Sequence, residues 1–255
     1  MKRFVYILTL FLFLINTSVF AETKYTQEEI KAVSPDGFNM VATLEYPKTK
    51  GIREYQTVVL LHSLGYHSQW WGQLPEELKK NGYAVLTIDL RGHGKSVYNS
   101  KLTKTSWKNL TLKAYAKYPD DVLAVFNKIK EDHPKKEFFA RWAIVGCDIG
   151  ASTGVLAADK FTSKPKTIVM LSPMVKTKSL YIPVSVAQLD GVDFLAIISE
   201  NNYASKNDSK YIMKFAQNEY QELYIDTKLS GMVMVREDEG TRQTIAKWVS
   251  QYLNQ

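Results

Sequence analysis

The chain has 255 residues, of which 45% are hydrophobic and 23% are charged, and its formal net charge is +7. This composition is typical of a globular protein and excludes a disordered or collagen-like chain. The single cysteine, Cys147, excludes an internal disulfide. No nucleic-acid-binding motif accompanies the basic residues, so we expect no nucleic-acid partner.

The first 21 residues predict a secretory signal peptide. Lys2 and Arg3 precede an apolar run over residues 4–15, and Val19-Phe20-Ala21 fits a small-residue cleavage site. The apolar run is short for a membrane span and no stop-transfer pattern follows, so we expect no stable membrane anchor. Residues 22–255 are then expected to be one exported domain, periplasmic or secreted, whose oligomeric state the sequence does not fix.

Apolar, β-prone runs alternate with helical patterns along the rest of the chain, which predicts an α/β fold with a largely parallel sheet. A turn at Pro35-Asp36-Gly37 predicts a hairpin between strands at 30–33 and 40–45. Helical spacing of apolar residues predicts helices around 122–129 and 245–252. Six further runs predict buried strands, at residues 57–61, 84–88, 142–145, 167–171, 194–198 and 223–225.

The stretch Gly146-Cys147-Asp148-Ile149-Gly150 lies between a predicted strand and a helix-compatible segment. This is the pattern of a nucleophile elbow, Gly-x-Ser-x-Gly, in which a tight turn exposes a serine at the edge of the sheet. Here Asp148 stands at the position of the serine. Since Cys147 precedes that position, we expect it to pack as a small apolar residue.

Two more segments occur in the order that an α/β hydrolase requires. Residues 58–65, VVLLHSLG, end a strand in a His-x-x-Gly loop, and residues 82–96, GYAVLTIDLRGHGKS, resemble the fourth-strand signature of that superfamily. Together with the elbow they make residues from about 27 onward resemble α/β hydrolases, most closely small secreted bacterial hydrolases related to serine aminopeptidases and dienelactone hydrolases. The resemblance implies a twisted, mostly parallel sheet of about eight strands with helices on both faces. It also implies an oxyanion and pocket region at His62, Ser63, Leu64 and Ile149.

The resemblance further places the other two triad positions. The acid position falls at Asn202, after the predicted strand at 194–198, and the histidine position falls at Ser230, after the last strand. None of the four histidines, His62, His67, His93 and His133, lies beyond the elbow. Loss of the base alone costs about 10⁶ in rate in a serine protease. We therefore predict that Asp148, Asn202 and Ser230 are inactive and that the protein binds a small molecule or a partner.

The alternative prediction is a hydrolase, either a weak esterase or peptidase or an enzyme with Asp148 as nucleophile. Haloalkane dehalogenases and epoxide hydrolases share the fold and use such an aspartate. Ile149 replaces the tryptophan that commonly follows it, and the late histidine is absent. Only 19 residues separate Met174 and Val192, inclusive, so we expect no sizeable lid domain. A purely structural role for Asp148, as a residue that caps the following helix, is a third interpretation.

The remaining polar residues carry structural predictions. We expect His62 and His93 to brace loops, Asp89 and Arg91 to tie the loop after the fourth strand, and Asp121 to be a helix N-terminal charge. No ligand spacing indicates a metal, and no cofactor is expected. Lysines gather between residues 101 and 117, at 101, 104, 108, 113 and 117. They indicate either a patch for anionic lipid or an acidic partner, or a solvated surface, which is the interpretation that we favour from sequence.

Overall fold

The computed structural model describes residues 25–49, 51 and 53–254. The predicted signal peptide lies outside the described residues. Within the described part of the chain, no helix is long and apolar enough to cross a membrane.

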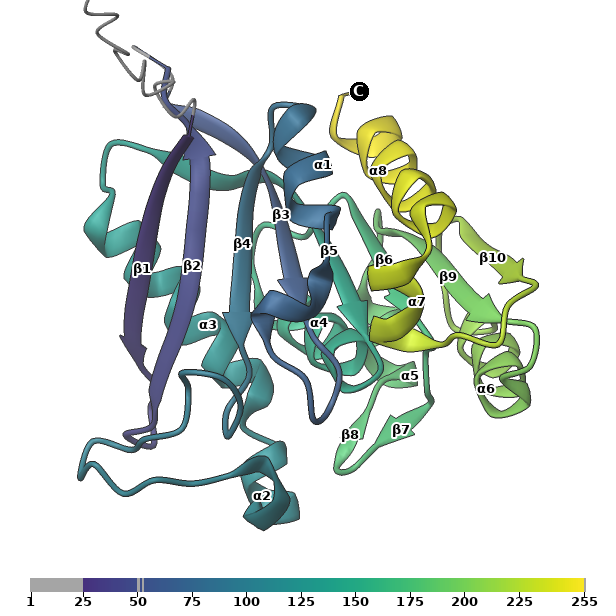
Figure 1. The fold of residues 1–255 in the computed structure, drawn as a ribbon, viewed down its shortest axis with the longest axis horizontal. Helices are drawn as coiled ribbons and strands as arrows, with labels where there is room; N and C mark the ends of the chain where they lie inside the picture. The colour runs from purple at the N-terminus through teal and green to yellow at the C-terminus, as the bar shows by residue number, and fades with distance from the viewer. Residues whose placement is uncertain (1–24, 50, 52, 255) are drawn as a thin grey trace, which may run out of the picture.

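One eight-stranded sheet runs through the molecule in the order β1-β2-β4-β3-β5-β6-β9-β10 (Figure 1). The hairpin of β1 and β2 is antiparallel, and β2 is also antiparallel to β4, whereas β4, β3, β5, β6, β9 and β10 are mutually parallel. All eight predicted strands are present, and the α/β prediction is confirmed. The strands are β1 (Tyr25–Val33), β2 (Asn39–Pro47), β3 (Glu54–Leu61), β4 (Ala84–Asp89), β5 (Glu137–Cys147), β6 (Thr167–Leu171), β9 (Asp193–Ser199) and β10 (Tyr220–Ile225).

Helices cover both faces of this sheet, as predicted. One face carries α3 (Tyr118–Asp132) and α4 (Ile149–Lys160), and the other carries α1 (Leu74–Lys80) and α8 (Glu239–Leu253) (Figure 1). The shorter elements are η1 (Ser68–Trp71), η2 (Trp107–Asn109), α2 (Leu112–Tyr115), β7 (Lys176–Thr177), β8 (Leu180–Tyr181), α5 (Pro183–Gln188), α6 (Tyr203–Met213) and α7 (Gly231–Glu237).

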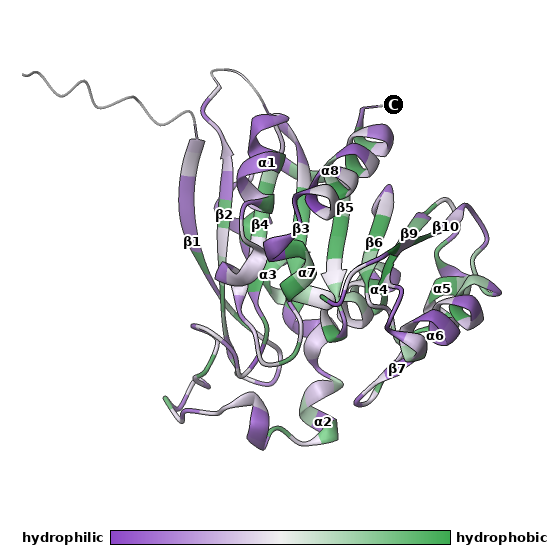
Figure 2. Cartoon of the chain, turned by 45° about the vertical axis from the view of Figure 1, so that its right-hand side comes forward, coloured by the Kyte–Doolittle hydropathy of each residue, from purple (hydrophilic) through white to green (hydrophobic). Residues whose placement is uncertain are grey.

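The central strands are apolar on both sides because each side contacts a helix layer. Along β3, Val59 and Leu61 belong to the core under α3 and α4, whereas Val58 and Leu60 belong to the core under α1 and α8. Successive side chains of a strand point to opposite faces of the sheet, so a strand that is buried on both faces, such as β3, needs a continuous run of apolar residues. Figure 2 shows hydrophobic residues along β3, β4 and β5, whereas β1 and α6 are mainly hydrophilic.

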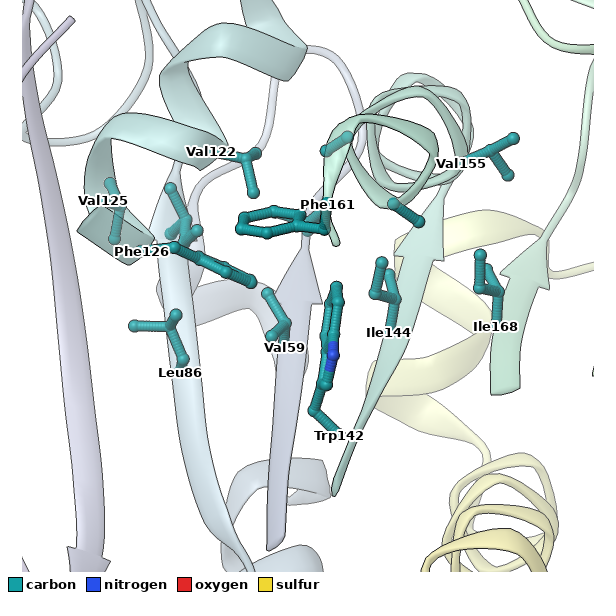
Figure 3. Close-up of a cluster of buried hydrophobic side chains, with 14 of the residues drawn as sticks. Val59, Leu86, Val122, Val125, Phe126, Trp142, Ile144, Val155, Phe161 and Ile168 are labelled. Atoms are coloured by element: carbon teal, nitrogen blue, oxygen red, sulfur yellow. The ribbon is translucent and has the colours of Figure 1, made fainter. Parts of the chain in front are cut away.

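Aromatic residues anchor the core beneath α3. Phe126 stacks on Phe139 with ring centroids 3.9 Å apart. Phe126 also meets Trp142 edge-on at 5.2 Å, and Figure 3 shows these two side chains together. The Trp142 indole N–H donates to the Ser163 carbonyl at 3.1 Å, so this buried polar group is satisfied. The packing fixes β5, the strand that leads into the elbow.

The loop after β4 is held by a buried arginine. The Arg91 guanidinium donates to both carboxylate oxygens of Asp121 in α3 and to both of Asp36 in the β1–β2 turn, at 2.6–2.9 Å. Asp121 lies in the first turn of α3, as predicted, and its carboxylate is in addition fully buried against Arg91. Asp89 accepts from the backbone N–H groups of Ser68 and Lys95, each at 2.8 Å.

Only small elements extend beyond the carboxyl ends of the parallel strands. They are the segment containing η2 and α2, and the hairpin of β7 and β8 (Figure 1). The Ser179 hydroxyl in the hairpin donates to the Leu112 carbonyl at 2.8 Å and joins the two. The prediction of no sizeable lid domain is confirmed.

Candidate functional site

Asp148 lies in a strained turn between β5 and α4. Its backbone has φ 50° and ψ −114°, a conformation that non-glycine residues rarely adopt. The flanking glycines are required by space: a Cβ at Gly146 would lie 2.5 Å from the Ala151 Cα, and one at Gly150 would lie 2.0 Å from the Leu61 carbonyl oxygen. The backbone of a nucleophile elbow is therefore present, with a carboxylate where the nucleophile is presented.

The Asp148 carboxylate has one side-chain partner. The Ser63 hydroxyl, from the loop after β3, donates to Oδ2 at 2.9 Å, and the Asp148 backbone N–H donates to the Leu171 carbonyl at 3.0 Å. The side chain makes no capping hydrogen bond to α4, so the interpretation of Asp148 as a helix cap is wrong. The positive φ explains this result, because capping residues normally have an extended backbone that turns the side chain toward the helix N–H groups.

Two backbone N–H groups beside this carboxylate are unpaired. The N–H groups of Leu64 and Ile149 donate to no acceptor in the described part of the chain. In the hydrolase elbow, the N–H after the nucleophile and one from the β3 loop form the oxyanion hole. Leu64 and Ile149 occupy those two places, while the Ser63 side chain contacts Asp148 directly.

Asn202 and Ser230 lie in the segments that follow β9 and β10, after the strands that the sequence predicted. Asn202 follows β9 and caps α6, with its side-chain oxygen accepting from the Ser205 N–H at 3.1 Å. Ser230 follows β10, is exposed and precedes α7. A Cβ at the next residue, Gly231, would lie 3.1 Å from the Cys147 sulfur, so this loop reaches the elbow. No hydrogen bond joins Asn202 or Ser230 to Asp148 in the described residues.

Two histidines near the site are committed to the backbone. His62 accepts from the Leu90 N–H through Nε2 at 2.9 Å, so its proton is on Nδ1, which donates to the Ser63 carbonyl at 2.8 Å. His93 accepts from the Gly65 N–H through Nε2 at 3.0 Å and donates from Nδ1 to the Arg91 carbonyl. Burial lowers the pKa of both imidazoles. Both brace loops, and neither has a nitrogen left for proton transfer.

The other two histidines lie in different surroundings. His67 Nε2 accepts from the Trp70 indole N–H at 3.1 Å, and His133 contacts the Glu28 carboxylate at 2.9 Å beside β1. Cys147 is fully buried, and burial raises the pKa of its thiol well above the usual range, so it packs as an apolar residue. In the described residues no group of three His, Cys, Asp or Glu side chains could hold a metal ion.

Ser172 is a site residue that the sequence reasoning missed. It follows β6, next to the Leu171 carbonyl that accepts from the Asp148 N–H, and its φ is 49°. Its hydroxyl is buried with no hydrogen-bond partner in the described part of the chain. The sequence signal was the Leu-Ser-Pro run that ends a predicted strand, but nothing in a strand end indicates a left-handed backbone.

Residues 53–244 match the family described as Serine aminopeptidase, S33. The match covers most of the chain. The chain belongs to this α/β-hydrolase family.

Proteins similar to this chain in sequence or in structure include a lipase homolog, an esterase and a dienelactone hydrolase. A monoglyceride lipase homolog of Monkeypox virus is 25% identical over 137 residues, which are 54% of this chain and 42% of the viral protein, so the chain spans less than half of that relative. An esterase of Pyrococcus furiosus has a TM-score of 0.68 at 14% identity, covering 90% of this chain and 92% of that one. A dienelactone hydrolase of Anabaena variabilis has a TM-score of 0.66 at 13% identity, covering 90% and 97%. At these identities the two structures show the fold alone.

Because the backbone at residue 148 is strained, glycine should be more stable there than alanine, the reverse of the usual order. At an ordinary exposed position glycine is less stable than alanine, but φ 50° at residue 148 reverses this preference. We expect Asp148→Gly to exceed Asp148→Ala in free energy of unfolding by about 1–2 kcal/mol in urea denaturation. Alanine as the more stable variant would show that the turn is not strained.

The two neutral histidines predict acid sensitivity. Because the folded pKa of each lies below the usual 6.5, unfolding takes up protons below that pH, and stability present above pH 6.5 is lost as the pH falls. Between pH 6.5 and 5 we expect a loss of about 1–3 kcal/mol in the free energy of unfolding. His93→Gln should show a shallower dependence on pH, and a flat profile in the unmodified protein would contradict the assignment.

Proposed function

We propose that this member of the hydrolase family binds a ligand at the elbow and does not hydrolyse it. One observation carries the proposal: no histidine forms a hydrogen bond with Asp148. Every histidine of the chain lies in the described residues, and each has a partner away from Asp148. Asn202 and Ser230, at the other two triad positions, cannot take a proton from a nucleophile near neutral pH.

Turnover by an aspartate nucleophile would also require cleavage of a covalent intermediate. A carboxylate can attack an alkyl carbon without a base, but the alkyl ester that results must be cleaved by an activated water. Without a histidine the ester would accumulate and the protein would stop after one reaction. An oxyanion hole and binding alone supply roughly 10³–10⁴ over the reaction in water.

The ligand class follows from the charge of the site. Asp148 presents a half-buried carboxylate, and only its Oδ2 accepts a hydrogen bond from another side chain in the described residues. A carboxylate accepts strong hydrogen bonds from ammonium and hydroxyl donors. We propose a small cationic or hydroxylated ligand whose donor group reaches the free carboxylate oxygen. As the predicted signal peptide requires, we place this function outside the cytoplasm, in the periplasm or the medium.

A hydrolase remains the second candidate, and a specific observation favours it. The family match and the esterase-like relatives support hydrolysis, and the N–H groups of Leu64 and Ile149 have no acceptor among the residues that the structure describes. The two candidates differ in one measurable property. Only the enzyme would show turnover that depends on the Asp148 carboxylate.

The test compares the unmodified protein with Asp148→Asn, which removes the charge and keeps the shape. We expect equal, background-level hydrolysis of short acyl esters, aminoacyl amides, haloalkanes and an epoxide by both proteins, and no increase in intact mass after incubation. Turnover that disappears in Asp148→Asn, or an alkyl adduct on Asp148, would overturn the proposal.

The ligand class is tested by thermal unfolding with n-butylammonium and with the neutral 1-butanol. We expect butylammonium alone to raise the melting temperature, and we expect Asp148→Asn to lose the increase. Asp190→Asn makes the same chemical change at an exposed residue elsewhere and should keep it. An increase that survives Asp148→Asn would place the binding site away from the elbow.

A further inference from the structure

A second feature lies on the outside of the same end of the molecule. We define the basic cap as residues 98–117 and the β7–β8 hairpin, residues 176–181. Neither segment contains an aspartate or a glutamate, and none occurs anywhere between Asp89 and Asp120. Both segments lie beyond the carboxyl ends of the parallel strands (Figures 1 and 2).

The two parts of the basic cap form one surface. Besides the hydrogen bond from Ser179 to the Leu112 carbonyl, the Lys178 ammonium lies 5.6 Å from the centre of the Tyr115 ring. Six exposed lysines of this surface form no ion pair with a carboxylate in the described residues: Lys101, Lys104, Lys108, Lys113, Lys176 and Lys178. Lys117 is different because it contacts Asp120 at 3.8 Å. Glu200 and Asp226 follow β9 and β10, at the far edge of the sheet, and the Asp208 carboxylate beside the hairpin accepts from the Val175 N–H at 2.9 Å.

Apolar side chains project from among these lysines. Leu102 is 76% exposed and Leu112 is 62% exposed. Leu102 also has φ 58°, a left-handed conformation that is unfavourable for leucine. The Asn99 side chain holds this loop tip by accepting from the N–H groups of Lys101 at 3.0 Å and Thr103 at 2.9 Å.

A leucine at the tip of such a loop contributes little to the folded chain. Asparagine or glycine would adopt φ 58° more easily, and a polar side chain would be better solvated. A solvated surface, which the lysine spacing alone favours, therefore explains the charges but not the leucines. The combination of unpaired lysines with projecting apolar side chains is complementary to an anionic surface with an accessible hydrocarbon layer.

We propose that the basic cap docks reversibly on an anionic lipid surface, with the lysines against the headgroups and Leu102 and Leu112 at the acyl boundary. The docking needs no hydrolysis and no ligand in the elbow, so it stands or falls independently of the proposed function. It also needs no membrane-spanning helix. It would hold the carboxyl ends of the parallel strands, where Asp148 lies, toward the lipid.

The experiment is cosedimentation of the protein with vesicles at about 0.1 M salt, where charges about 10 Å apart still interact. Vesicles containing phosphatidylglycerol should bind the protein, and vesicles of phosphatidylcholine alone should not. Each lysine near such a surface is worth about fivefold in affinity. The triple variant Lys101→Gln, Lys104→Gln, Lys108→Gln should therefore bind about a hundredfold more weakly. The matched control, Lys130→Gln, Lys135→Gln, Lys247→Gln, changes the same charge away from the basic cap and should bind like the unmodified protein.

A variant at Leu102 distinguishes binding to a lipid surface from binding to a soluble polyanion. Leu102→Asn suits the left-handed backbone, so it should fold at least as well as the unmodified protein and bind vesicles about tenfold more weakly. Its binding to soluble polyglutamate should be unchanged. Asp148→Asn should bind vesicles normally.

Three results would overturn the proposal. Equal binding to phosphatidylcholine vesicles would remove the role of charge, and an equal loss in the control triple variant would reduce it to net charge. Vesicle binding that depends on the lysines but not on Leu102 would show attraction by charge alone, and it would contradict docking at the acyl boundary.

Discussion

The turn from β5 into α4 leaves no room for a side chain at Gly146 or Gly150, and the candidate site depends on this constraint. The close approach of the helix to the β3 carbonyl at Leu61 forces the intervening residue into a positive φ and points it out of the sheet edge. The geometry is set by the glycines and by packing on either side of β5, not by the residue that it presents. Asp148 can therefore stand in the place of a serine without disturbing the fold. The backbone turn can be kept even when the side chain that the reaction needs is replaced.

The buried histidines likewise have a structural role and no free ring nitrogen. His62 and His93 occupy both ring nitrogens with backbone groups, and this arrangement holds the loops after β3 and β4 against each other. Such histidines stabilise the oxyanion region but cannot shuttle a proton. At Asn202 the side chain has a different role, since it caps α6. The strained turn at Asp148 is retained, and the hydrogen bonds of all four histidines go to groups other than Asp148.

Sequence alone predicted the sheet well because its central strands are apolar on both faces; the boundaries of β6 were those of the predicted strand at 167–171. It placed the start of β5 too late, since residues 137–141 mix polar and apolar side chains. The hairpin of β7 and β8 was missed because two-residue strands carry no periodicity. The three triad positions came from motif order, and the structure places each after the expected strand. Contacts such as Arg91 with Asp36 and Asp121, or Ser63 with Asp148, join residues distant in sequence, and no pattern within one sequence specifies them.

The most direct test of the central claim is to restore the missing side chains in one variant, Asp148→Ser, Asn202→Asp, Ser230→His. If the backbone of the site is intact and only proton transfer is lost, this variant should regain activity. We expect it to hydrolyse a short acyl ester at least a hundredfold faster than Asp148→Ser alone, and we expect a fluorophosphonate to label the new serine. A folded triple variant with neither activity nor labelling would contradict it, because positions 202 and 230 would then not converge on the elbow.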